Sequence, residues 1–412
     1  MPDTKDENNN RKTKVIDNKE IEKRRETKSS QRTRIIIISV AAAAVIFLIV
    51  FFVAGGYEKL LDMFGVERDV SVTPTITLVE AEINGTVVIA GNGGTTIVYD
   101  EHGVTGYGAD GKWKWNEKCS VNNPKVTDCG DFAVIADVGG TAAYAFDKTG
   151  VVWKYGRDNT IKSVFGKGKY ICVIHDEKEY LSAVTVYEYE KKTSSLKELF
   201  TRKFSSHYMI TGAISNDGKQ MVLSGVLSDN GEANGIITFV RMSDGEIFSS
   251  EILKNNVYVK VEYADNNSVF AANSDSVKVL YKSMSVSSGG DRVQELWSRG
   301  NLQNGIIDVA LVAGKQCVVS IGNDGAEKTV VKGFDTAGKE LFNIEVAGNV
   351  IGMDSADDAF VVFTESHIYL YNNKGKLIGE VEAGFKIECA SCIDGRHVSV
   401  CGDKKLLTAS FE

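Results

Sequence analysis

The hydrophobic residues of this chain follow two different patterns. One is an unbroken run at residues 35–54, IIIISVAAAAVIFLIVFFVA, in which Ser39 alone is polar. At 1.5 Å per residue, a helix of this length spans about 30 Å, the thickness of the hydrocarbon core of a bilayer. The other pattern begins at Pro74 and consists of short apolar runs separated by Gly, Asn and Asp turns. It predicts an all-β domain.

Lysine and arginine residues flank the apolar run on its N-terminal side. They are Lys23, Arg24, Arg25, Lys28, Arg32 and Arg34. Such a cluster marks the cytoplasmic end of a membrane helix. We therefore predict a single transmembrane helix at residues 35–54 of a plasma-membrane protein, with residues 57–412 outside the cell. A cleaved signal peptide is the alternative, but its apolar core is usually shorter, at about 7–15 residues.

The segments on either side of the apolar run have different characters. Residues 1–34 contain almost no apolar side chains and are predicted to form a disordered, basic cytoplasmic tail that contacts anionic lipid head groups. Residues 57–68 place Leu60, Leu61 and Phe64 at helical spacing, which predicts a short juxtamembrane stalk helix. Residues 74–412 then form the extracytoplasmic β domain.

The β domain repeats one unit of strand, turn, strand and tight hairpin. Examples are Ala133–Ala136 followed by TAAYAFDKTGVVWKYG, and Phe360–Phe363 followed by HIYLYNNKGKLIGEV. Each hairpin of the recognisable units ends in a glycine, which supplies the positive φ that a short hairpin needs. These glycines are Gly111, Gly150, Gly245, Gly338 and Gly375.

The spacing of these glycines predicts the number of units. The intervals are 39, 95, 93 and 37 residues, and the two long ones are each about twice 47. Turn-like sequences fall midway, at residues 191–197 and 287–292, which gives seven hairpins. The C-terminal residues 385–411 supply three more strands, and residues 76–81 supply a fourth. The two ends of the chain therefore close an eighth unit, which predicts an eight-bladed β-propeller, with seven blades as the alternative.

One unit carries a motif of a known family. Residues 145–155, AFDKTGVVWKY, place Ala145, Asp147, Gly150 and Trp153 at the offsets of the tryptophan-docking repeat, and this segment resembles quinoprotein (PQQ)-type propellers. Residues 110–115 match in part, through Gly111 and Trp113. The units of Gly245, Gly338 and Gly375 keep the turn but have Phe248, Phe342 and Ile378 in place of the tryptophan.

This resemblance implies an eight-bladed fold and a structural role for the repeat residues. It implies that Trp153 packs flat between adjacent blades. It does not imply the quinone cofactor, because quinoprotein dehydrogenases carry a vicinal disulfide and this chain has no adjacent cysteine pair. We therefore expect no cofactor.

The plan of basic tail, anchor and degenerate propeller resembles an uncharacterised family (a domain of unknown function) of membrane-anchored propellers from Gram-positive anaerobes. The domain type is also similar to the propeller lipoprotein that assists outer-membrane protein assembly, a binding scaffold.

The charge of the chain argues against nucleic acid as a partner. Residues 1–34 carry 11 Lys/Arg against 7 Asp/Glu, and subtracting this +4 from the net charge of −8 leaves −12 for the remainder. A domain this acidic repels a phosphate backbone.

The seven cysteines do not form a disulfide framework, because their number is odd and their spacing wide. Cys389 and Cys392 form a C-x-x-C motif in a predicted strand, where positions three apart face opposite sides, so we expect small buried side chains there and not a redox or metal site. Cys401 in the next strand is placed to join one of them. Cys119 and Cys129 flank the join between two units and are candidates for a disulfide.

No other motif points to catalysis or to a metal. Asp354, Asp357 and Asp358 lack the spacing of a calcium loop and are expected to form a solvated turn. The five histidines are scattered singly, and neither a nucleophile elbow nor a phosphate-binding loop is present in the sequence. Carboxylates that converge from different blades escape this kind of search.

The sequence therefore predicts a non-enzymatic, membrane-anchored binding scaffold for a protein or a cell-envelope glycan. The alternatives are a propeller enzyme that hydrolyses or cleaves glycans, and a sensor that signals to the cytoplasmic tail. Trp113 and Trp115 lie two residues from each other in a strand beside a hairpin, and we expect at least one of them to be exposed, where an aromatic ring can stack on a sugar.

Overall fold

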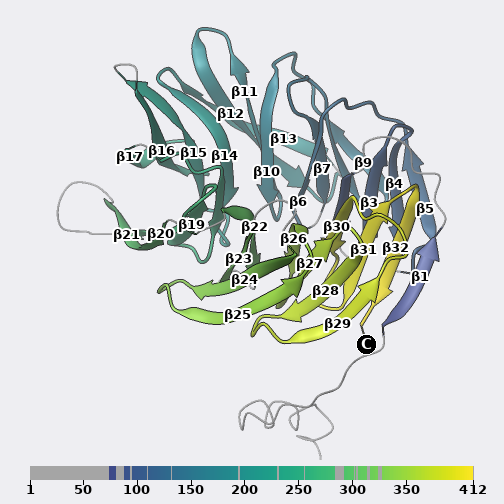
Figure 1. Cartoon of the computed structure of the whole chain (residues 1–412). Coiled ribbons are helices and arrows are strands. Elements are labelled where there is room, and N and C mark those ends of the chain that lie inside the picture. Colours follow the sequence, from purple (N-terminus) through teal and green to yellow (C-terminus); the bar gives the residue numbers. More distant parts are fainter. Residues whose placement is uncertain are drawn as a thin grey trace, which may run out of the picture. The chain divides into compact units, whose positions relative to one another are not determined.

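The computed structural model describes residues 74–411, except residues 80–87, 93–94, 109, 131, 194, 230–231, 255, 284–291, 301, 303–304, 313–315 and 323–326. These residues form eight four-stranded antiparallel sheets, or blades, around a common axis (Figure 1). The predicted tail (residues 1–34), transmembrane helix (35–54) and stalk helix (57–68) lie outside the described residues. Within the described ranges, no helix is long and apolar enough to cross a membrane.

Each blade is numbered here in chain order, and its strands run from the axis outward. Blade 1 contains β2 (Val88–Asn92), β3 (Thr95–Asp100), β4 (Gly103–Gly108) and β5 (Trp113–Glu117); blade 2 contains β6 (Pro124–Asp128), β7 (Ala133–Asp137), β8 (Ala143–Asp147) and β9 (Gly150–Lys154); blade 3 contains β10 (Ile161–Lys167), β11 (Tyr170–Glu177), β12 (Tyr180–Glu190) and β13 (Ser195–Phe204); blade 4 contains β14 (His207–Ile214), β15 (Gln220–Asp229), β16 (Glu232–Arg241) and β17 (Ile247–Leu253).

The second half of the ring follows the same order until the last blade. Blade 5 contains β18 (Lys260–Tyr263), β19 (Ser268–Ala272), β20 (Val277–Ser283) and β21 (Arg292–Arg299); blade 6 contains β22 (Ile306–Val312), β23 (Gln316–Ile321), β24 (Lys328–Asp335) and β25 (Glu340–Ala347); blade 7 contains β26 (Val350–Ala356), β27 (Ala359–Thr364), β28 (His367–Asn372) and β29 (Leu377–Glu382); blade 8 contains β30 (Cys389–Cys392), β31 (His397–Gly402), β32 (Lys405–Ser410) and β1 (Thr75–Val79).

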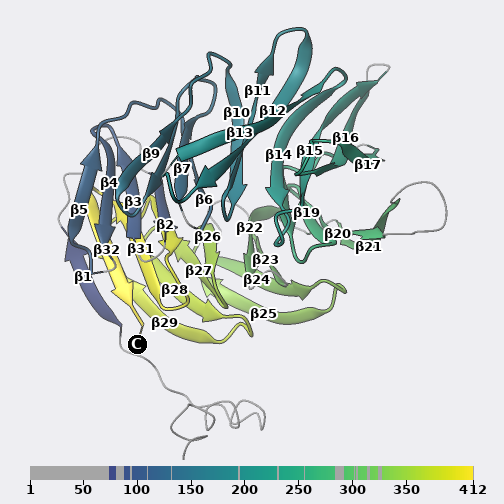
Figure 2. The same ribbon diagram turned by 180° about the vertical axis from the view of Figure 1, so that it is seen from behind.

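Blade 8 is built from both ends of the β domain. Strand β1 pairs antiparallel with β32, in a register that sets Thr75 opposite Ser410 and Val79 opposite Leu406 (Figure 2). The predicted closure by residues 76–81 is therefore confirmed, and so are eight blades in preference to seven. The hairpin predicted from spacing at residues 191–197 joins β12 to β13. Strands β20 and β21 pair antiparallel on either side of the one predicted at residues 287–292, of which residues 287–291 lie outside the described residues. Closure removes the free edge that β32 would otherwise expose.

The apolar strands form the core because each sheet is sandwiched between two neighbours. Both faces of β7 and of β27 are covered, and every residue of these strands is buried. Eight apolar clusters result, each shared by two adjacent blades. Between blades 1 and 2, for example, Ile97 packs with Ile135 and Phe146. Near-continuous apolar runs are the sequence signature of this arrangement.

Several outer strands add an aromatic side chain that docks on the next blade. Trp115 in β5 donates from its indole Nε1 to the carbonyl oxygen of Lys148, 3.1 Å away, in the β8–β9 hairpin. Trp297 in β21 does the same to Thr336, at 3.0 Å, beside the β24–β25 hairpin. Each outer hairpin is followed by a β-bulge that places this residue opposite the third strand, as in the pairs Gly106↔Trp115 and Val279↔Trp297.

Two of the hairpin glycines, Gly338 and Gly375, lie against an aromatic ring of the preceding blade. Gly338 and Gly375 have φ values of +80° and +76°. A Cβ added to Gly338 would lie 2.7 Å from the Trp297 ring, and one added to Gly375 would lie 2.5 Å from Phe342. Glycine is therefore needed at these turns for the left-handed backbone and also for the close approach of the ring.

Candidate functional site

The inner strands of blades 2 to 7 enclose a cavity on the axis of the ring. Its volume is about 710 Å³, and its wall is formed by β6, β10, β14, β18, β22 and β26. Figure 1 shows β6, β22 and β26 at the middle of the ring. Six charged side chains belong to the wall, and they are Lys125, Asp128, Lys167, Lys260, Glu262 and Asp354.

The repeat brings these charges together from distant parts of the sequence. Lys125 lies opposite Ala136 in blade 2, and Lys260 lies opposite Ala272 in blade 5, so the two lysines hold equivalent positions in their blades. Glu262 lies two residues beyond Lys260. Because side chains two residues apart leave a strand on the same side, both face the same way. No local sequence motif indicates this cluster, since blades 2, 3, 5 and 7 contribute only one or two of its residues each.

One set of bonds joins blades 5, 6 and 7. The Lys260 ammonium group forms an ion pair with Asp308, at 3.2 Å from Nζ to Oδ1, and also donates to the carbonyl oxygen of Val309. The second carboxylate oxygen of Asp308 accepts a hydrogen bond from the backbone N–H of Met353, 2.9 Å away. The Asp308 carboxylate of blade 6 thus binds the Lys260 ammonium group of blade 5 and the Met353 N–H of blade 7.

A second set joins blades 7, 8 and 1. Oδ2 of Asp354 accepts from the Ser391 hydroxyl at 2.8 Å and from the Cys392 N–H at 3.0 Å. The Ser391 oxygen accepts in turn from the N–H of Gly91, at 3.0 Å. Burial raises the pKa of the Asp354 carboxyl, and the hydrogen bonds from Ser391 and Cys392 offset part of that rise.

Lys125 joins blades 2 and 3. Its ammonium group donates to the Ser163 hydroxyl, 2.9 Å away, and Thr127 donates to the carbonyl oxygen of Val164 at 3.2 Å. Burial lowers the pKa of the Lys125 ammonium group, and the positive charge of Lys260 lowers it further. Most polar residues of the cavity wall therefore form hydrogen bonds or ion pairs that join neighbouring blades.

Glu262 differs from the other carboxylates of the wall. Water reaches its side chain, yet among the described residues it has no hydrogen bond and no ion pair. The protein that surrounds the cavity raises the pKa of this carboxyl by desolvation, and the charges of Lys260 and Lys167 act in the opposite direction. Val259, three residues earlier in the chain, presents an apolar side chain that is 59% exposed and also lines the cavity. These two residues are available to a ligand.

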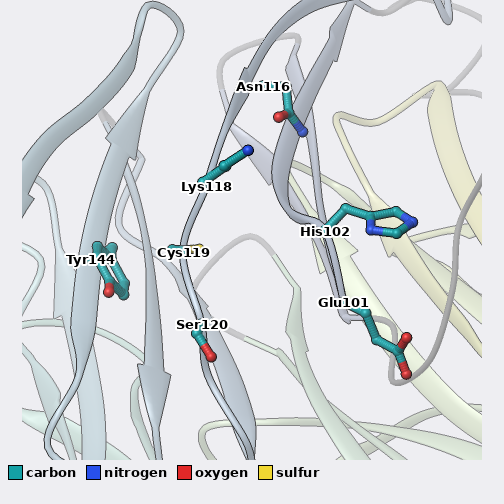
Figure 3. A pocket seen from close by; sticks show the side chains of 7 residues that line it. All are labelled: Glu101, His102, Asn116, Lys118, Cys119, Ser120 and Tyr144. Carbon is teal, nitrogen blue, oxygen red and sulfur yellow. The ribbon is translucent and has the colours of Figure 1, made fainter.

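A second depression lies between blades 1 and 2 (Figure 3). It is open, and Glu101, His102, Asn116, Cys119 and Tyr144 are among the residues that line it. A cysteine near a histidine suggests a nucleophile, but burial, with the charges of Glu117 and Asp100, raises the pKa of the Cys119 thiol to about 11. Because the thiolate is the nucleophilic form, this thiol is poorly reactive at neutral pH.

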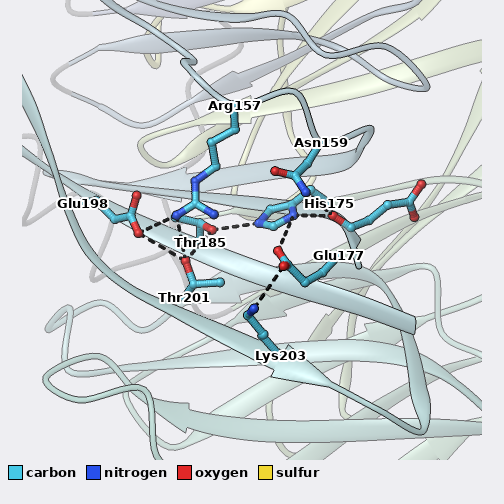
Figure 4. Close-up of polar contacts among 9 residues, drawn as sticks. Arg157, Asn159, His175, Glu177, Thr185, Glu198, Thr201 and Lys203 are labelled. Atoms are coloured by element: carbon cyan, nitrogen blue, oxygen red, sulfur yellow. Dashed lines mark hydrogen bonds and ion pairs between the residues drawn. The ribbon is translucent and has the colours of Figure 1, made fainter. Parts of the chain in front are cut away.

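A polar network covers one end of blade 3 (Figure 4). The fully buried His175 contacts the Thr185 hydroxyl through Nε2 at 2.8 Å, and Thr185 contacts Thr201 at 2.9 Å. Arg157, in the link from blade 2, donates to Thr201 at 3.1 Å and to Glu198 at 2.6 Å. Burial lowers the pKa of His175, so its imidazole is held neutral. The network attaches the link between the two blades to the sheet.

The remaining predicted motifs are structural where the structure describes them. Cys119 and Cys129 are free thiols, so the candidate disulfide is absent. Cys389 and Cys392 belong to different apolar clusters, which confirms that they face opposite sides of the strand. Asp357 accepts from the N–H of Gly395 in a turn, and no group of three or more potential metal ligands occurs in the part of the chain that is described.

The predicted repeat residues lie on the outer rim, away from the cavity. Gly111, Gly150, Gly338 and Gly375 are in the outer hairpins, as predicted, and all have positive φ. The carboxylate of Asp147 accepts from Thr149 in the hairpin turn at 2.7 Å. Trp153 is partly buried against Tyr187, with ring centroids 5.0 Å apart and a tilt of 55°.

Two corrections concern the aromatic docking positions. Trp113 is 64% exposed and does not dock; the docking residue of blade 1 is Trp115, because the bulge moves the position two residues along the strand. The expected exposure of at least one of the two is confirmed. Trp297 of blade 5, which docks on blade 6, did not appear in the predicted repeat. The strand register likewise assigns Ser249 and Gly379, not Phe248 and Ile378, to the docking positions of blades 4 and 7.

Comparison with known proteins supports the fold and gives no activity. The crystal structure of Saccharomyces cerevisiae Sqt1 is similar at a TM-score of 0.55 and 12% identity, over 82% of this chain and 98% of that one. Chaetomium thermophilum Sqt1 bound to the N-terminus of the ribosomal protein L10 has a TM-score of 0.45 and 14% identity, over 67% of this chain and 81% of that one. The Neurospora crassa Pan2 WD40 domain has a TM-score of 0.44 and 9% identity, over 80% of this chain and 89% of that one. No curated protein matches the sequence. Residues 68–409 match the model of a family of unknown function, DUF5711.

Proposed function

This chain belongs to the DUF5711 family, whose function is unknown, and we propose that it is a membrane-anchored interaction scaffold whose propeller binds a partner protein outside the cell. The apolar run at residues 35–54 and the basic flank before it support the anchor and the orientation. The sequence resemblance to membrane-anchored propellers is a further reason for proposing the anchor. The fold by itself is compatible with many functions, so a function has to be inferred from the residues of the site.

The observation that carries the proposal is the state of Glu262. The other carboxylates that fasten the inner strands, Asp308 and Asp354, accept hydrogen bonds from neighbouring blades. Glu262 is accessible to water and is not used in this way. Because Val259 is exposed and lines the same cavity, the cavity wall offers both a carboxylate and an apolar side chain.

This combination favours a basic partner. A lysine or arginine side chain has a long apolar stem and a charged end, so it suits a cavity wall that presents an apolar side chain and a carboxylate. The net charge of −12 on the chain beyond residue 34 attracts a basic surface over a longer range. A glycan ligand, which we also expected from the sequence, would use the exposed ring of Trp113 instead.

Photo-crosslinking in intact cells tests this proposal. A photoreactive amino acid is placed at position 259, at the cavity, or at position 113, on the rim, in the full-length protein. We expect an adduct with one protein from position 259 and none from position 113. Glu262→Gln should reduce the yield about tenfold, equivalent to ~1.4 kcal/mol of binding. Glu382→Gln, on an exposed outer strand, is the matched control and should not change it. Adducts from position 113 alone would contradict the proposal.

A propeller enzyme is the second candidate, and one observation favours it. The pKa values of Glu262 and Asp354 are both raised, as a general acid in glycoside cleavage requires. Asp354 is however already hydrogen-bonded to Ser391 and Cys392. If the enzyme hypothesis is correct, envelope glycans incubated with the protein are cleaved, and Glu262→Gln abolishes cleavage without a loss of stability.

A further inference from the structure

Two cysteines of the closing blade lie directly opposite each other. Cys389 is the first residue of β30, and it pairs in register with Cys401 of β31. Residues that are directly opposite in an antiparallel pair have Cα atoms about 4.5–5.5 Å apart. This is within the range of about 4.4–6.8 Å that a disulfide requires.

The two side chains also leave their strands on the same face. Both belong to the apolar cluster between blades 8 and 1, which contains Ile89, Tyr107 and Leu406. Cys392, three residues along β30, belongs instead to the cluster between blades 7 and 8. Cys401 is fully buried, whereas Cys389 is partly exposed. A reagent in solution can therefore reach one member of the pair, and that member lies next to the other.

The surroundings show that the two thiols interact. The Cys401 thiol has a pKa raised mainly by burial and further by a hydrogen bond with Cys389. Both are free thiols in the structure.

We propose that Cys389 and Cys401 form a cross-strand disulfide when the protein meets an oxidant, and that this bond secures the inner strand of the closing blade. Strand β30 has only four residues, and two of them, Ser391 and Cys392, hold blade 8 to blades 7 and 1. A covalent link from β30 to β31 would limit local opening of β30. The hydrogen bonds from blade 8 to blades 7 and 1 would then be kept.

The oxidant is a disulfide, either a low-molecular-weight disulfide or the oxidised dithiol of an oxidoreductase. The Cys389 thiolate attacks one sulfur of this disulfide, its proton goes to water, and the other sulfur leaves as a thiol. The sulfur of Cys401 then attacks Sγ of Cys389, and the proton of the buried Cys401 thiol passes to the second sulfur of the oxidant, which leaves as a thiol. The protein loses two hydrogen atoms and the oxidant gains them. Such oxidants are present outside the cytoplasm, where the proposed orientation puts this domain.

The chain offers a direct assay, because Arg396 separates the two cysteines. Trypsin releases residues 387–396, with Cys389 and Cys392, and residues 397–404, with Cys401. Purified full-length protein is treated with oxidised glutathione, its remaining thiols are alkylated in denaturant, and an unreduced digest is examined by mass spectrometry. We expect these two peptides to be linked, with Cys392 alkylated and Cys389 not. Both peptides alkylated at every cysteine, or a link through Cys392, would overturn the proposal.

Two variants complete the test. Cys389→Ser should prevent the link, and the matched control Cys392→Ser should preserve it. The melting temperature of Cys392→Ser should be higher after oxidation than after reduction, and oxidation should not raise that of Cys389→Ser. An equal shift in the two variants would overturn the role assigned to this disulfide, even if the bond itself forms.

Discussion

Gly338→Ala tests the aromatic docking that joins the outer rims of the blades. The hairpin of blade 6 contains Gly338 at φ +80°, and the ring of Trp297 from blade 5 lies against it. A methyl group at this position would lie 2.7 Å from Cγ and from Cδ2 of that ring. These are indole atoms near the backbone, so the ring cannot simply swing away while its Nε1 remains bonded to Thr336.

The expected loss has two parts. An alanine in the left-handed region costs about 1–2 kcal/mol. Forcing an extra carbon against a packed ring costs about 1–3 kcal/mol more. We therefore expect Gly338→Ala to lower the free energy of unfolding by ~2–5 kcal/mol.

The measurement is thermal and denaturant unfolding of the full-length protein, followed by circular dichroism. Gly384→Ala is a matched control, because Gly384 has φ +69° and open space within 4 Å of its added Cβ. It should show only the backbone cost of about 1–2 kcal/mol. Trp297→Ala should be destabilising by itself, but in its background Gly338→Ala should cost no more than Gly384→Ala does, because the overlap is gone.

The reasoning would be refuted by equal losses for Gly338→Ala and Gly384→Ala. It would also be refuted if the losses from Gly338→Ala and Trp297→Ala simply added. Either result would mean that the ring and the turn are not in contact.

Three further predictions concern closure, packing and pH. Deletion of residues 75–79 should expose the edge of β32 and cause loss of cooperative unfolding and aggregation, as measured by light scattering during melting; an unchanged, monomeric protein would contradict the closure. Trp153→Ala should cost about 3 kcal/mol, the lower end for a large aromatic since it is partly exposed, whereas Trp113→Ala should be within about 0.5 kcal/mol of wild type; equal losses would contradict the assignment. His175 has a lowered pKa in the folded protein, so below about pH 6.5 the unfolded chain binds a proton that the folded chain does not. Stability should therefore fall from pH 7 to 5, and His175→Gln should reduce this slope; the same slope in both proteins would contradict a buried neutral imidazole.

The blade count was predictable because it depends on one local requirement. Each short hairpin needs a positive φ, and Gly at positions such as 111 and 375 records that requirement in the sequence. The docking aromatics were harder to find, because hairpin length and the β-bulge change their distance from the glycine. Trp153 follows Gly150 by three residues, while Phe342 follows Gly338 by four.

The cavity could not be predicted from the sequence. Lys125, Lys260, Glu262 and Asp354 come from blades 2, 5 and 7, and only the closed ring brings them to one axis. Within its own strand, each appears as an ordinary polar residue among apolar ones. The ion pairs and hydrogen bonds of Lys125, Lys260 and Asp354 depend on the neighbouring blade, which lies dozens of residues away in the sequence.

The proposed partner and the oxidising surroundings of Cys389 both require that the propeller lies outside the cell. This placement is therefore the central claim about function. Trp113→Cys and Ser30→Cys variants of the full-length protein should be treated with a membrane-impermeant maleimide on cells stripped of any wall, with the unsubstituted protein as background. The account predicts labelling at position 113 on intact cells and at position 30 only after permeabilisation. Labelling at position 30 on intact cells, with position 113 protected until permeabilisation, would contradict it.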